Sequence, residues 1–305
     1  MQKIKTQLRN IARENLPSPA YAFLYKSFKN ISNLKDVYGG GLEMDRNRLE
    51  KDISFTSAGF YDFVLDDTRF KIFLDPKNGG VDYEIYANKN FEPGILNIFK
   101  KELKSTDIFL DVGANIGQHS LYASRFCERV ISFEPIKRLY DQFNKSVVEN
   151  NILNIQAFNY ALGNKKEELP IYSSDVNMGA SSIMVSENRK VEQVIKVLRL
   201  DDEYEKMNIS KIDFVKIDVE GYELNVLLGM RDIIQEHKPK ILVEYTPFFY
   251  NKIDKSIGKN LYDFLVDNKY EIWDVGNLGE KYVKVESFDD IKDMDQTNLF
   301  CKIIN

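Results

Sequence analysis

The stretch from Asp111 to Gly117, Asp-Val-Gly-Ala-Asn-Ile-Gly, has the residue types and spacing of a ligand-binding turn. It follows an apolar run and opens a helical pattern, so its glycines let a ligand approach the backbone and the start of a helix closely. Glu134 ends the next predicted strand, where a carboxylate can accept hydrogen bonds from both hydroxyls of a ribose. Together these features predict a site for a nucleoside-containing ligand at the carboxyl ends of the strands.

The charge of Asp111 distinguishes between two kinds of cofactor. A dinucleotide site uses G-x-G-x-x-G, whose backbone amides face a pyrophosphate, whereas three residues separate Gly113 from Gly117 here. An ionised carboxylate would repel a pyrophosphate and attract the ammonium of S-adenosylmethionine, near its sulfonium. We therefore predict S-adenosylmethionine rather than a nicotinamide cofactor. The predicted cofactor-binding residues are Asp111, Gly113, Asn115, Gly117, Glu134, Asn159, Ala161 and Asp218.

A second group of charged residues lies in the string Lys216-Ile-Asp218-Val-Glu220-Gly-Tyr-Glu223. Lys216 and Asp218 are two residues apart on a predicted strand, so they share one face, and a buried charged pair needs partners. Glu220 and Glu223 fall in the first turn of the next helix, where a carboxylate also complements the helix dipole. We favour that structural interpretation for Glu223 and leave both interpretations open for Glu220. Glu244 ends the neighbouring strand and is predicted to face the same cleft.

Apolar strands alternate with helical stretches from residue 107 onward, which predicts a mostly parallel α/β sheet with helices on both faces. Residues 164–200 carry an irregular pattern that can include a hairpin. The predicted strands cover 108–110, 129–133, 155–159, 212–218, 240–245, 270–274 and 299–303. The predicted helices cover 116–126, 137–150, 222–235 and 258–268.

The first 90 residues have a different character from the rest of the chain. Residues 1–30 predict one or two helices, and the glycines at 39–41 mark a flexible joint. Alternating runs at 60–65 and 69–74 predict a hairpin, and Pro93 is typical of the first turn of a helix. We expect an N-terminal helical and hairpin extension over 1–90 and the main α/β domain over 91–305.

The composition excludes several classes of protein. The 305 residues are 43% hydrophobic and 29% charged, which rules out a disordered, collagen-like or disulfide-stapled chain. No run approaches the roughly 18 apolar residues of a membrane-spanning helix. Cys127 and Cys301 lie far apart, which indicates a reducing compartment, and the two histidines, His119 and His237, are too few for a His/Cys zinc site. We predict a soluble, cytoplasmic protein.

The charges are unevenly distributed along the chain. Residues 1–35 carry seven basic side chains and one acidic side chain, although the net charge of the whole chain is −5. We favour a solvated amphipathic helix packed on the main domain, and the alternative is peripheral contact with an anionic membrane at its inner face. The acidic remainder disfavours nucleic acid as a partner.

Three strings together resemble the FkbM-type methyltransferases: Asp111 to Gly117, Phe133-Glu-Pro135 and Val215 to Glu223. The resemblance covers roughly residues 105–250, and the string Lys-Ile-Asp-Val-Glu-Gly is its most specific part. It implies a Rossmann-like class I methyltransferase fold whose seven-stranded sheet has one reversed strand. It also implies O-methylation, commonly of sugar hydroxyls. Supporting fragments are Ala161-Leu-Gly163, Leu200-Asp-Asp202 and Ile241-Leu-Val-Glu-Tyr245.

From this resemblance we expect an S-adenosylmethionine-dependent O-methyltransferase that acts on a carbohydrate hydroxyl of a surface-glycan or glycolipid precursor. The alternatives are a non-catalytic S-adenosylmethionine-binding module and a methyltransferase for a small molecule that is not a sugar. A nucleic-acid methyltransferase is disfavoured by the missing Asn/Asp-Pro-Pro-aromatic string, and an oxidoreductase by the glycine spacing. The acceptor and the oligomeric state stay open.

Methyl transfer needs mainly alignment of the two reactants, and a general base adds about 10²–10⁴-fold for a hydroxyl nucleophile. A divalent cation bound through oxygen ligands is the alternative to a protein base. Asn159 and Ala161 end the third strand, where adenine is expected, and residues 179–183 suit an acceptor-binding loop. The candidate bases are Asp218, Glu220, His119 and Glu244, and the candidate cation ligands are Asp218, Glu220 and Glu244.

Overall fold

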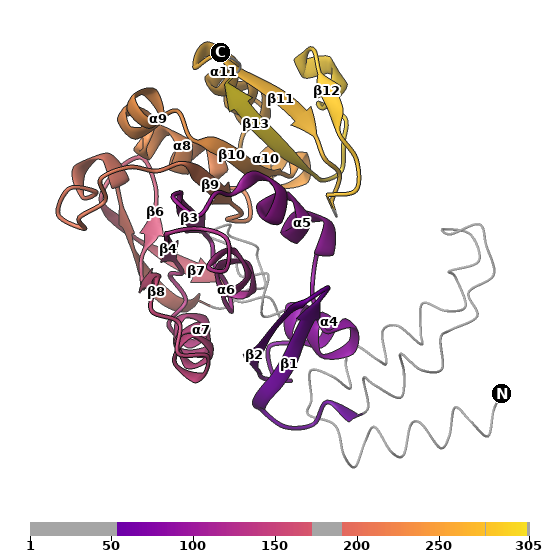
Figure 1. Cartoon of the computed structure of the whole chain (residues 1–305). Coiled ribbons are helices and arrows are strands. Elements are labelled where there is room, and N and C mark those ends of the chain that lie inside the picture. Colours follow the sequence, from indigo (N-terminus) through magenta and orange to yellow (C-terminus); the bar gives the residue numbers. More distant parts are fainter. Residues whose placement is uncertain (1–53, 173–190, 278, 304–305) are drawn as a thin grey trace, which may run out of the picture.

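The computed structural model describes residues 54–172, 191–277 and 279–303. Its centre is an eight-stranded sheet with helices packed on both faces (Figure 1). This architecture confirms the predicted α/β class. In order across the sheet, the strands are β12 (Val283–Val285), β11 (Tyr270–Asp274), β13 (Thr297–Ile303), β10 (Lys240–Tyr245), β9 (Phe214–Ile217), β3 (Ile108–Val112), β4 (Arg129–Phe133) and β5 (Ile155–Phe158).

Five neighbouring strands, from β10 to β5, run parallel, as the alternation of strands and helices predicts. Strand β13 is antiparallel to both β10 and β11, which is the reversed strand that the family resemblance implied. The sheet has eight strands rather than seven, because β12 pairs antiparallel with β11 and extends that edge. β12 has three residues, too few for alternation to be recognised in the sequence.

Alternating side chains of the central strand β3 enter two separate hydrophobic cores. Phe109 packs in the first core and Leu110 in the second, because successive side chains of a strand point to opposite faces. The predicted helix over 222–235 is two helices that meet at Met230. The first core is covered by α5 (Pro93–Glu102), α6 (Gln118–Ala123) and α7 (Lys137–Glu149), and the second by α8 (Glu223–Gly229), α9 (Arg231–His237), α10 (Pro247–Ile253) and α11 (Ile257–Asp267).

The predicted hairpin is confirmed as β1 (Gly59–Leu65) and β2 (Thr68–Leu74), and a helix that we did not expect, α4 (Gly80–Asn88), follows it. Strand β2 is bonded to α7, because the N–H of Phe73 donates to Ser146 Oγ at 2.9 Å. The stacked rings of Phe63 and Phe70 belong to the first core. The hairpin therefore packs on the same core as the main sheet, and the boundary near residue 90 stays a prediction.

A small three-stranded sheet stands beside the large one. It contains β6 (Ala161–Leu162), β8 (Val191–Leu198) and β7 (Glu167–Tyr172), and β7 and β8 are antiparallel, so the irregular segment does include a hairpin. Two 3-10 turns, η2 (Leu200–Asp202) and η3 (Phe288–Asp290), complete the described elements. The loop at 179–183 and the basic segment at 1–35 lie outside the described residues.

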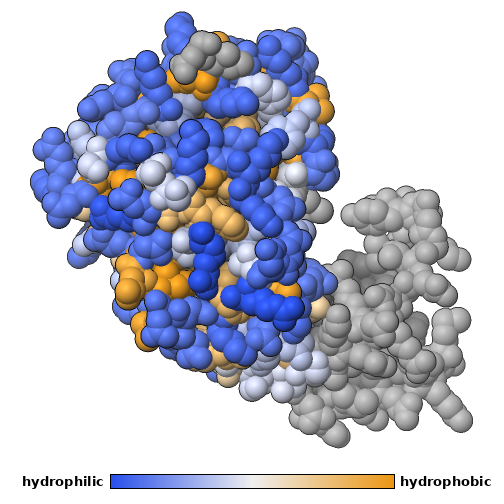
Figure 2. All heavy atoms as spheres, in the orientation of Figure 1, coloured by the Kyte–Doolittle hydropathy of each residue, from blue (hydrophilic) through white to orange (hydrophobic). Residues whose placement is uncertain are grey.

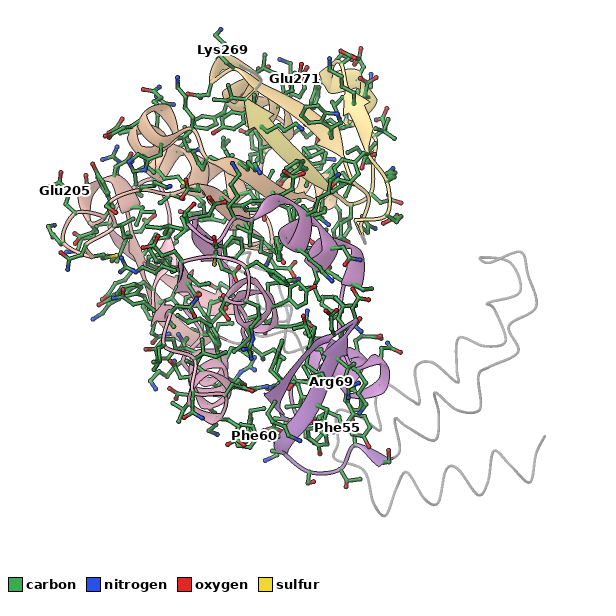
Figure 3. All side chains as sticks on the ribbon, in the orientation of Figure 1. Phe55, Phe60, Arg69, Glu205, Lys269 and Glu271 are labelled. Carbon is green, nitrogen blue, oxygen red and sulfur yellow. The ribbon has the colours of Figure 1, made fainter. Side chains whose placement is uncertain are left out.

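The outer surface is mainly hydrophilic on the face shown in Figure 2, where hydrophobic residues form small separate areas. Figure 3 shows Phe55 and Phe60 at the hairpin end of the molecule and Lys269 at the opposite end. Within the described ranges, no helix is long and apolar enough to cross a bilayer.

Candidate active site

A cavity lies at the carboxyl ends of β3, β4, β9 and β10, where ligands bind in open α/β sheets. Its lining combines polar and apolar residues. The polar lining residues include Glu92, Asn115, His119, Glu134, Lys216, Asp218, Glu220, Glu244 and Gln296. The apolar lining residues include Ile136, Leu139, Ala161, Leu162, Ile171 and Ile195.

The glycine turn between β3 and α6 has a left-handed backbone at three positions, including Asn115 with φ 53°. Gly113 has φ +82°, and a Cβ there would stand 1.9 Å from the backbone oxygen of Asp218. Gly117 has φ +83°, and a Cβ there would stand 1.9 Å from the ring of Phe143. Gly113 thus lets the turn touch the loop after β9, and Gly117 lets α6 pack on α7.

Glu134 follows β4 and is held in place by two backbone groups. The N–H of Asn115 donates to its Oε2 and the N–H of Ile136 donates to its Oε1, each at 2.8 Å. Burial raises the pKa of Glu134 to about 7, although both hydrogen bonds act in the opposite direction. Each carboxylate oxygen keeps a lone pair for a ligand hydroxyl. The arrangement fits the ribose of a nucleoside.

We expect the affinity for S-adenosylhomocysteine to fall as the pH drops through about 7. Glu134 is ionised above its raised pKa and protonated below it, and only the ionised carboxylate can accept from both ribose hydroxyls. Between about pH 8 and about pH 6 its ionised fraction falls roughly tenfold, so the Kd should rise up to about tenfold. Isothermal titration calorimetry at the two pH values measures this change in Kd. Glu134→Gln should bind weakly at both pH values, and the surface variant Asp263→Asn should behave as the wild type. A pH-independent wild-type Kd would contradict the assignment.

Asp111 does not reach the cavity wall, contrary to our expectation that it faces the cofactor directly. Its side chain is fully buried, and Ser120 Oγ donates to its Oδ2 at 2.5 Å. Its Oδ1 lies 3.8 Å from Lys216 Nζ, because β3 and β9 pair Asp111 with Lys216 across the sheet. The charge of Asp111 therefore acts on the cavity through Lys216.

Lys216 and Asp218 share one face of the chain, as their spacing predicts, and both line the cavity. Lys216 Nζ donates to Asp218 Oδ2 at 3.1 Å. Burial opposes the charged form of Lys216, but the carboxylates of Asp218, Asp111 and Glu92 outweigh burial and raise its pKa. The buried ammonium is thus compensated by carboxylates on both sides.

Glu220 and Glu223 lie in different environments, although they are only three residues apart. Glu223 is fully buried and accepts hydrogen bonds from the N–H groups of Gly221 at 3.0 Å and Val219 at 3.2 Å. These contacts agree with the structural interpretation of Glu223. Glu220 lines the cavity with φ 55°, a left-handed conformation that is strained for a residue other than glycine.

Glu244 lines the cavity from the end of β10. Its Oε1 accepts from Gln296 Nε2, and its Oε2 is buried with no hydrogen-bond partner among the described residues. Burial raises the pKa of Glu244 well above its usual range, and the neighbouring carboxylates Asp218 and Glu220 raise it further. A carboxylate with one fixed and one unpartnered oxygen is suited to accept a proton from a ligand.

His119 also lines the cavity and is 7% exposed. Its Nε2 lies 3.4 Å from Glu92 Oε2 and makes no hydrogen bond within the described part of the chain. Gln118 fixes the loop before Glu92, because its side-chain amide both donates to and accepts from the backbone of Phe91. Our sequence prediction missed Glu92 and Gln296, since neither belongs to a motif and only the fold brings them to the cavity.

Asn159 and Ala161 lie near each other but differ in their contacts. Asn159 Nδ2 donates to the backbone oxygens of Glu134 at 2.8 Å and Pro135 at 2.9 Å, so it holds the loop after β4. It is absent from the cavity lining that the described residues form, whereas Ala161 is one of the apolar residues of that lining. Ala161 is therefore the better placed of the two to contact a ligand.

The fragment Leu200-Asp-Asp202 forms the 3-10 turn η2 and supports a neighbouring helix. Asp201 accepts from the N–H groups of Asp232 and Ile233 and thereby caps the start of α9. In the described ranges, no group of three or more His, Cys, Asp or Glu side chains is arranged to hold a metal ion. The geometry thus does not support a cation held by Asp218, Glu220 and Glu244.

Comparison with known proteins gives a family and several relatives. The family model of the Methyltransferase FkbM domain matches residues 111–272. The chain is 29% identical over 150 residues to Hexuronic acid methyltransferase AglP of Haloferax volcanii, which covers 47% of this chain and 58% of that protein. It is 26% identical over 184 residues to Methyltransferase 1 of Beauveria bassiana, covering 50% of this chain and 73% of that protein.

A solved structure of a Methyltransferase FkbM from Methylobacillus flagellatus matches with a TM-score of 0.43 and 18% identity. The match covers 72% of this chain and 54% of that chain. The chain thus spans little more than half the length of AglP and of this solved structure.

Proposed function

Because the chain belongs to the FkbM methyltransferase family, we propose that it is an S-adenosylmethionine-dependent O-methyltransferase that acts on a carbohydrate hydroxyl. One observation carries the proposal: a single cavity is lined both by Glu134, whose oxygens suit a ribose, and by Glu244, whose unpartnered oxygen suits a hydroxyl proton. The first group fits the cofactor and the second fits the acceptor.

The residues that would hold S-adenosylmethionine lie on the β3, β4 and β5 side of the cavity. The turn at Gly113 and Asn115 offers its backbone, and Glu134 offers its carboxylate to the ribose. The apolar residues Ile136 and Ala161 fit a flat adenine ring on the same side. Lys216 lies further along the sheet, where its ammonium can bind the carboxylate of the methionine part.

The bound cofactor supplies the methyl group as a sulfonium, so the protein must align the acceptor and remove one proton. Glu244 is the preferred base, because Gln296 fixes one of its oxygens and leaves the other to the acceptor. Asp218 is already engaged by Lys216 and is the second choice. His119 is the third candidate, since its Nε2 faces Glu92.

A sugar acceptor is supported by the printed name of a relative, Hexuronic acid methyltransferase AglP, and by the carboxylate and amide groups of the cavity. Such groups match the donors and acceptors of a polyhydroxylated ring. We place the reaction in the cytoplasm, at the inner face of the membrane when the basic segment at 1–35 contacts anionic lipid. A surface-glycan or glycolipid precursor would meet the enzyme there.

Thermal unfolding with different ligands, followed by a turnover assay, tests the proposal. S-adenosylmethionine and S-adenosylhomocysteine should stabilise the protein and NAD should not, and a ligand at 100 times its Kd adds about 2.7 kcal/mol. With a mixture of glycosides, S-adenosylhomocysteine should form. Stabilisation by NAD would contradict the cofactor. Binding of the cofactor without product from any hydroxylated acceptor would instead support a non-catalytic module.

A further inference from the structure

We propose that residues 78–92, which precede the segment that matches the family, form one wall of the cofactor site. In this wall Val81 contacts the adenosine part of S-adenosylmethionine, and Glu92 contacts the ammonium group of its methionine part. The inference rests on the proposed cofactor and gives a function to the segment between the hairpin and α5. The family match covers residues 111–272, so it does not include this wall.

Three residues of the wall reach the cavity. Val81 lies in the first turn of α4, which stands beside the hairpin (Figure 1), and Phe91 and Glu92 come directly before α5. All three line the same cavity as Glu134 and Lys216, the groups that we assign to the ribose and to the carboxylate of the cofactor. A ligand that extends from Glu134 to Lys216 therefore meets this segment.

A buried network of hydrogen bonds fixes α4 on α7. Gln142 Nε2 donates to Asp82 Oδ1 at 2.7 Å, and Asn78 Nδ2 donates to Gln142 Oε1 at 2.6 Å. Arg138, one helical turn before Gln142, donates to Asn78 Oδ1 at 2.7 Å. The side chains of Asn78, Asp82 and Gln142 are buried, and buried hydrogen bonds restrict where α4 can lie. Val81, the neighbour of Asp82, is thus held beside the first turns of α7.

The place of Val81 matches the adenosine part of the ligand. The first turn of α7 carries Leu139, and Ile136 immediately precedes this helix; both line the cavity together with Ala161. Glu134, the proposed ribose ligand, is two residues before Ile136. The adenine attached to that ribose therefore falls among these apolar side chains, and Val81 adds another apolar surface to its pocket.

A second buried glutamine fixes the other end of the wall. Gln118 Nε2 donates to the carbonyl oxygen of Phe91 at 2.8 Å, and Gln118 Oε1 accepts from the N–H of Phe91 at 2.7 Å. The next residue, Glu92, has φ 52°, a left-handed conformation that is strained for a residue other than glycine. Its Oε2 lies 3.4 Å from His119 Nε2. The surrounding contacts thus impose the position of Glu92 at the cavity.

The charge of Glu92 complements the methionine part of the cofactor. This part carries a carboxylate and an ammonium on one carbon atom, so it is best bound by a cation and an anion that lie close together. Lys216 supplies the cation. Burial opposes the charge of Lys216, but neighbouring carboxylates, Glu92 among them, raise its pKa. Glu92 is therefore near the Lys216 ammonium, as the two charges of the methionine part require.

Two ligands separate the two contacts. S-adenosylhomocysteine has both parts of the cofactor, whereas 5′-methylthioadenosine keeps the adenosine part and lacks the amino-acid group. Isothermal titration calorimetry measures the Kd of each. We expect Val81→Ala to raise both Kd values by the same factor, about three- to tenfold, because two methyl groups of an adenosine contact are lost. We expect Glu92→Gln to raise the Kd of S-adenosylhomocysteine about tenfold and to leave that of 5′-methylthioadenosine unchanged.

Val148→Ala and Glu149→Gln are the matched controls, because both residues are exposed on α7 and lie outside the cavity lining that the described residues form. Neither control should change either Kd. If S-adenosylhomocysteine binds the wild type, Val81→Ala and Glu92→Gln with equal affinity, the wall is refuted while the cofactor assignment stands. An equal loss of both ligands in Glu92→Gln would overturn the ammonium contact. If neither ligand binds the wild type, the proposed cofactor fails and the wall with it.

The variant Gln142→Leu tests whether the network acts through Val81. Gln142 is outside the lining formed by the described residues, so it would be a positioning residue. We expect both Kd values to rise as in Val81→Ala, and the double variant to bind no more weakly than the weaker single variant, because both changes affect one contact. Circular dichroism checks that the variants are folded, and Asn78→Ala is the milder second variant. Additive losses, or unchanged Kd values in both folded network variants, would overturn this role.

Discussion

The variant Glu244→Gln is expected to lower kcat by about 10²–10⁴-fold, the usual contribution of a general base, while the Kd for S-adenosylhomocysteine stays nearly unchanged. The substitution keeps the shape of the side chain and its contact with Gln296, but it removes the oxygen that accepts the proton. Burial and the carboxylates Asp218 and Glu220 raise the pKa of Glu244. The ionised form of Glu244, which acts as the base, therefore becomes populated at pH values above the usual pKa range of a carboxyl group.

The pH dependence of kcat separates this role from a structural one. In the wild type, kcat should increase with pH as Glu244 loses its proton, and in Glu244→Gln this increase should be absent. Asp218→Asn and His119→Asn serve as comparisons, because both residues line the same cavity. An unchanged kcat in Glu244→Gln, with a large loss in one of the comparison variants, would move the base to that residue.

The variant Gly113→Ala is expected to abolish cofactor binding and to destabilise the fold by about 3 kcal/mol or more, beyond the 1–3 kcal/mol of a strained backbone. Its Cβ would stand 1.9 Å from the backbone oxygen of Asp218, and φ is +82°. A backbone group cannot rotate away as a side chain can. The turn after β3 and the loop after β9 would have to separate, and both line the cofactor site.

Gly79→Ala is the matched control for Gly113→Ala. Gly79 has φ +69° and no atom within 4 Å of its added Cβ, so it reports the backbone strain without the clash. Urea unfolding measures both variants, and calorimetry measures binding of S-adenosylhomocysteine. Gly117→Ala completes the series, because its added Cβ would clash with the side chain of Phe143 rather than with a backbone group. The double variant Gly117→Ala/Phe143→Leu should therefore recover part of the stability that Gly117→Ala loses. Equal destabilisation of Gly113→Ala and Gly79→Ala would refute the clash.

The order and type of most elements could be predicted from the amino-acid sequence. Periodicity and turn residues are local properties, so the hairpin at 59–74, the helix that begins at Pro93 and the alternation after residue 107 could be recognised directly. The places of the motif residues in the fold could be predicted as well. Since the carboxyl ends of parallel strands share one edge, Glu134, Asp218 and Glu244 had to lie at the same edge of the sheet.

Which of these groups contact one another depends on the packing of the folded chain. Asp111 is buried 3.8 Å from the ammonium of Lys216, because the pairing of β3 with β9 places the two residues side by side. Glu92 and Gln296 reach the cavity beside His119 and Glu244, although each is remote in the chain from the motifs there. Ion pairs and hydrogen bonds depend on distances of a few ångströms between segments far apart in sequence, and no local pattern encodes those distances.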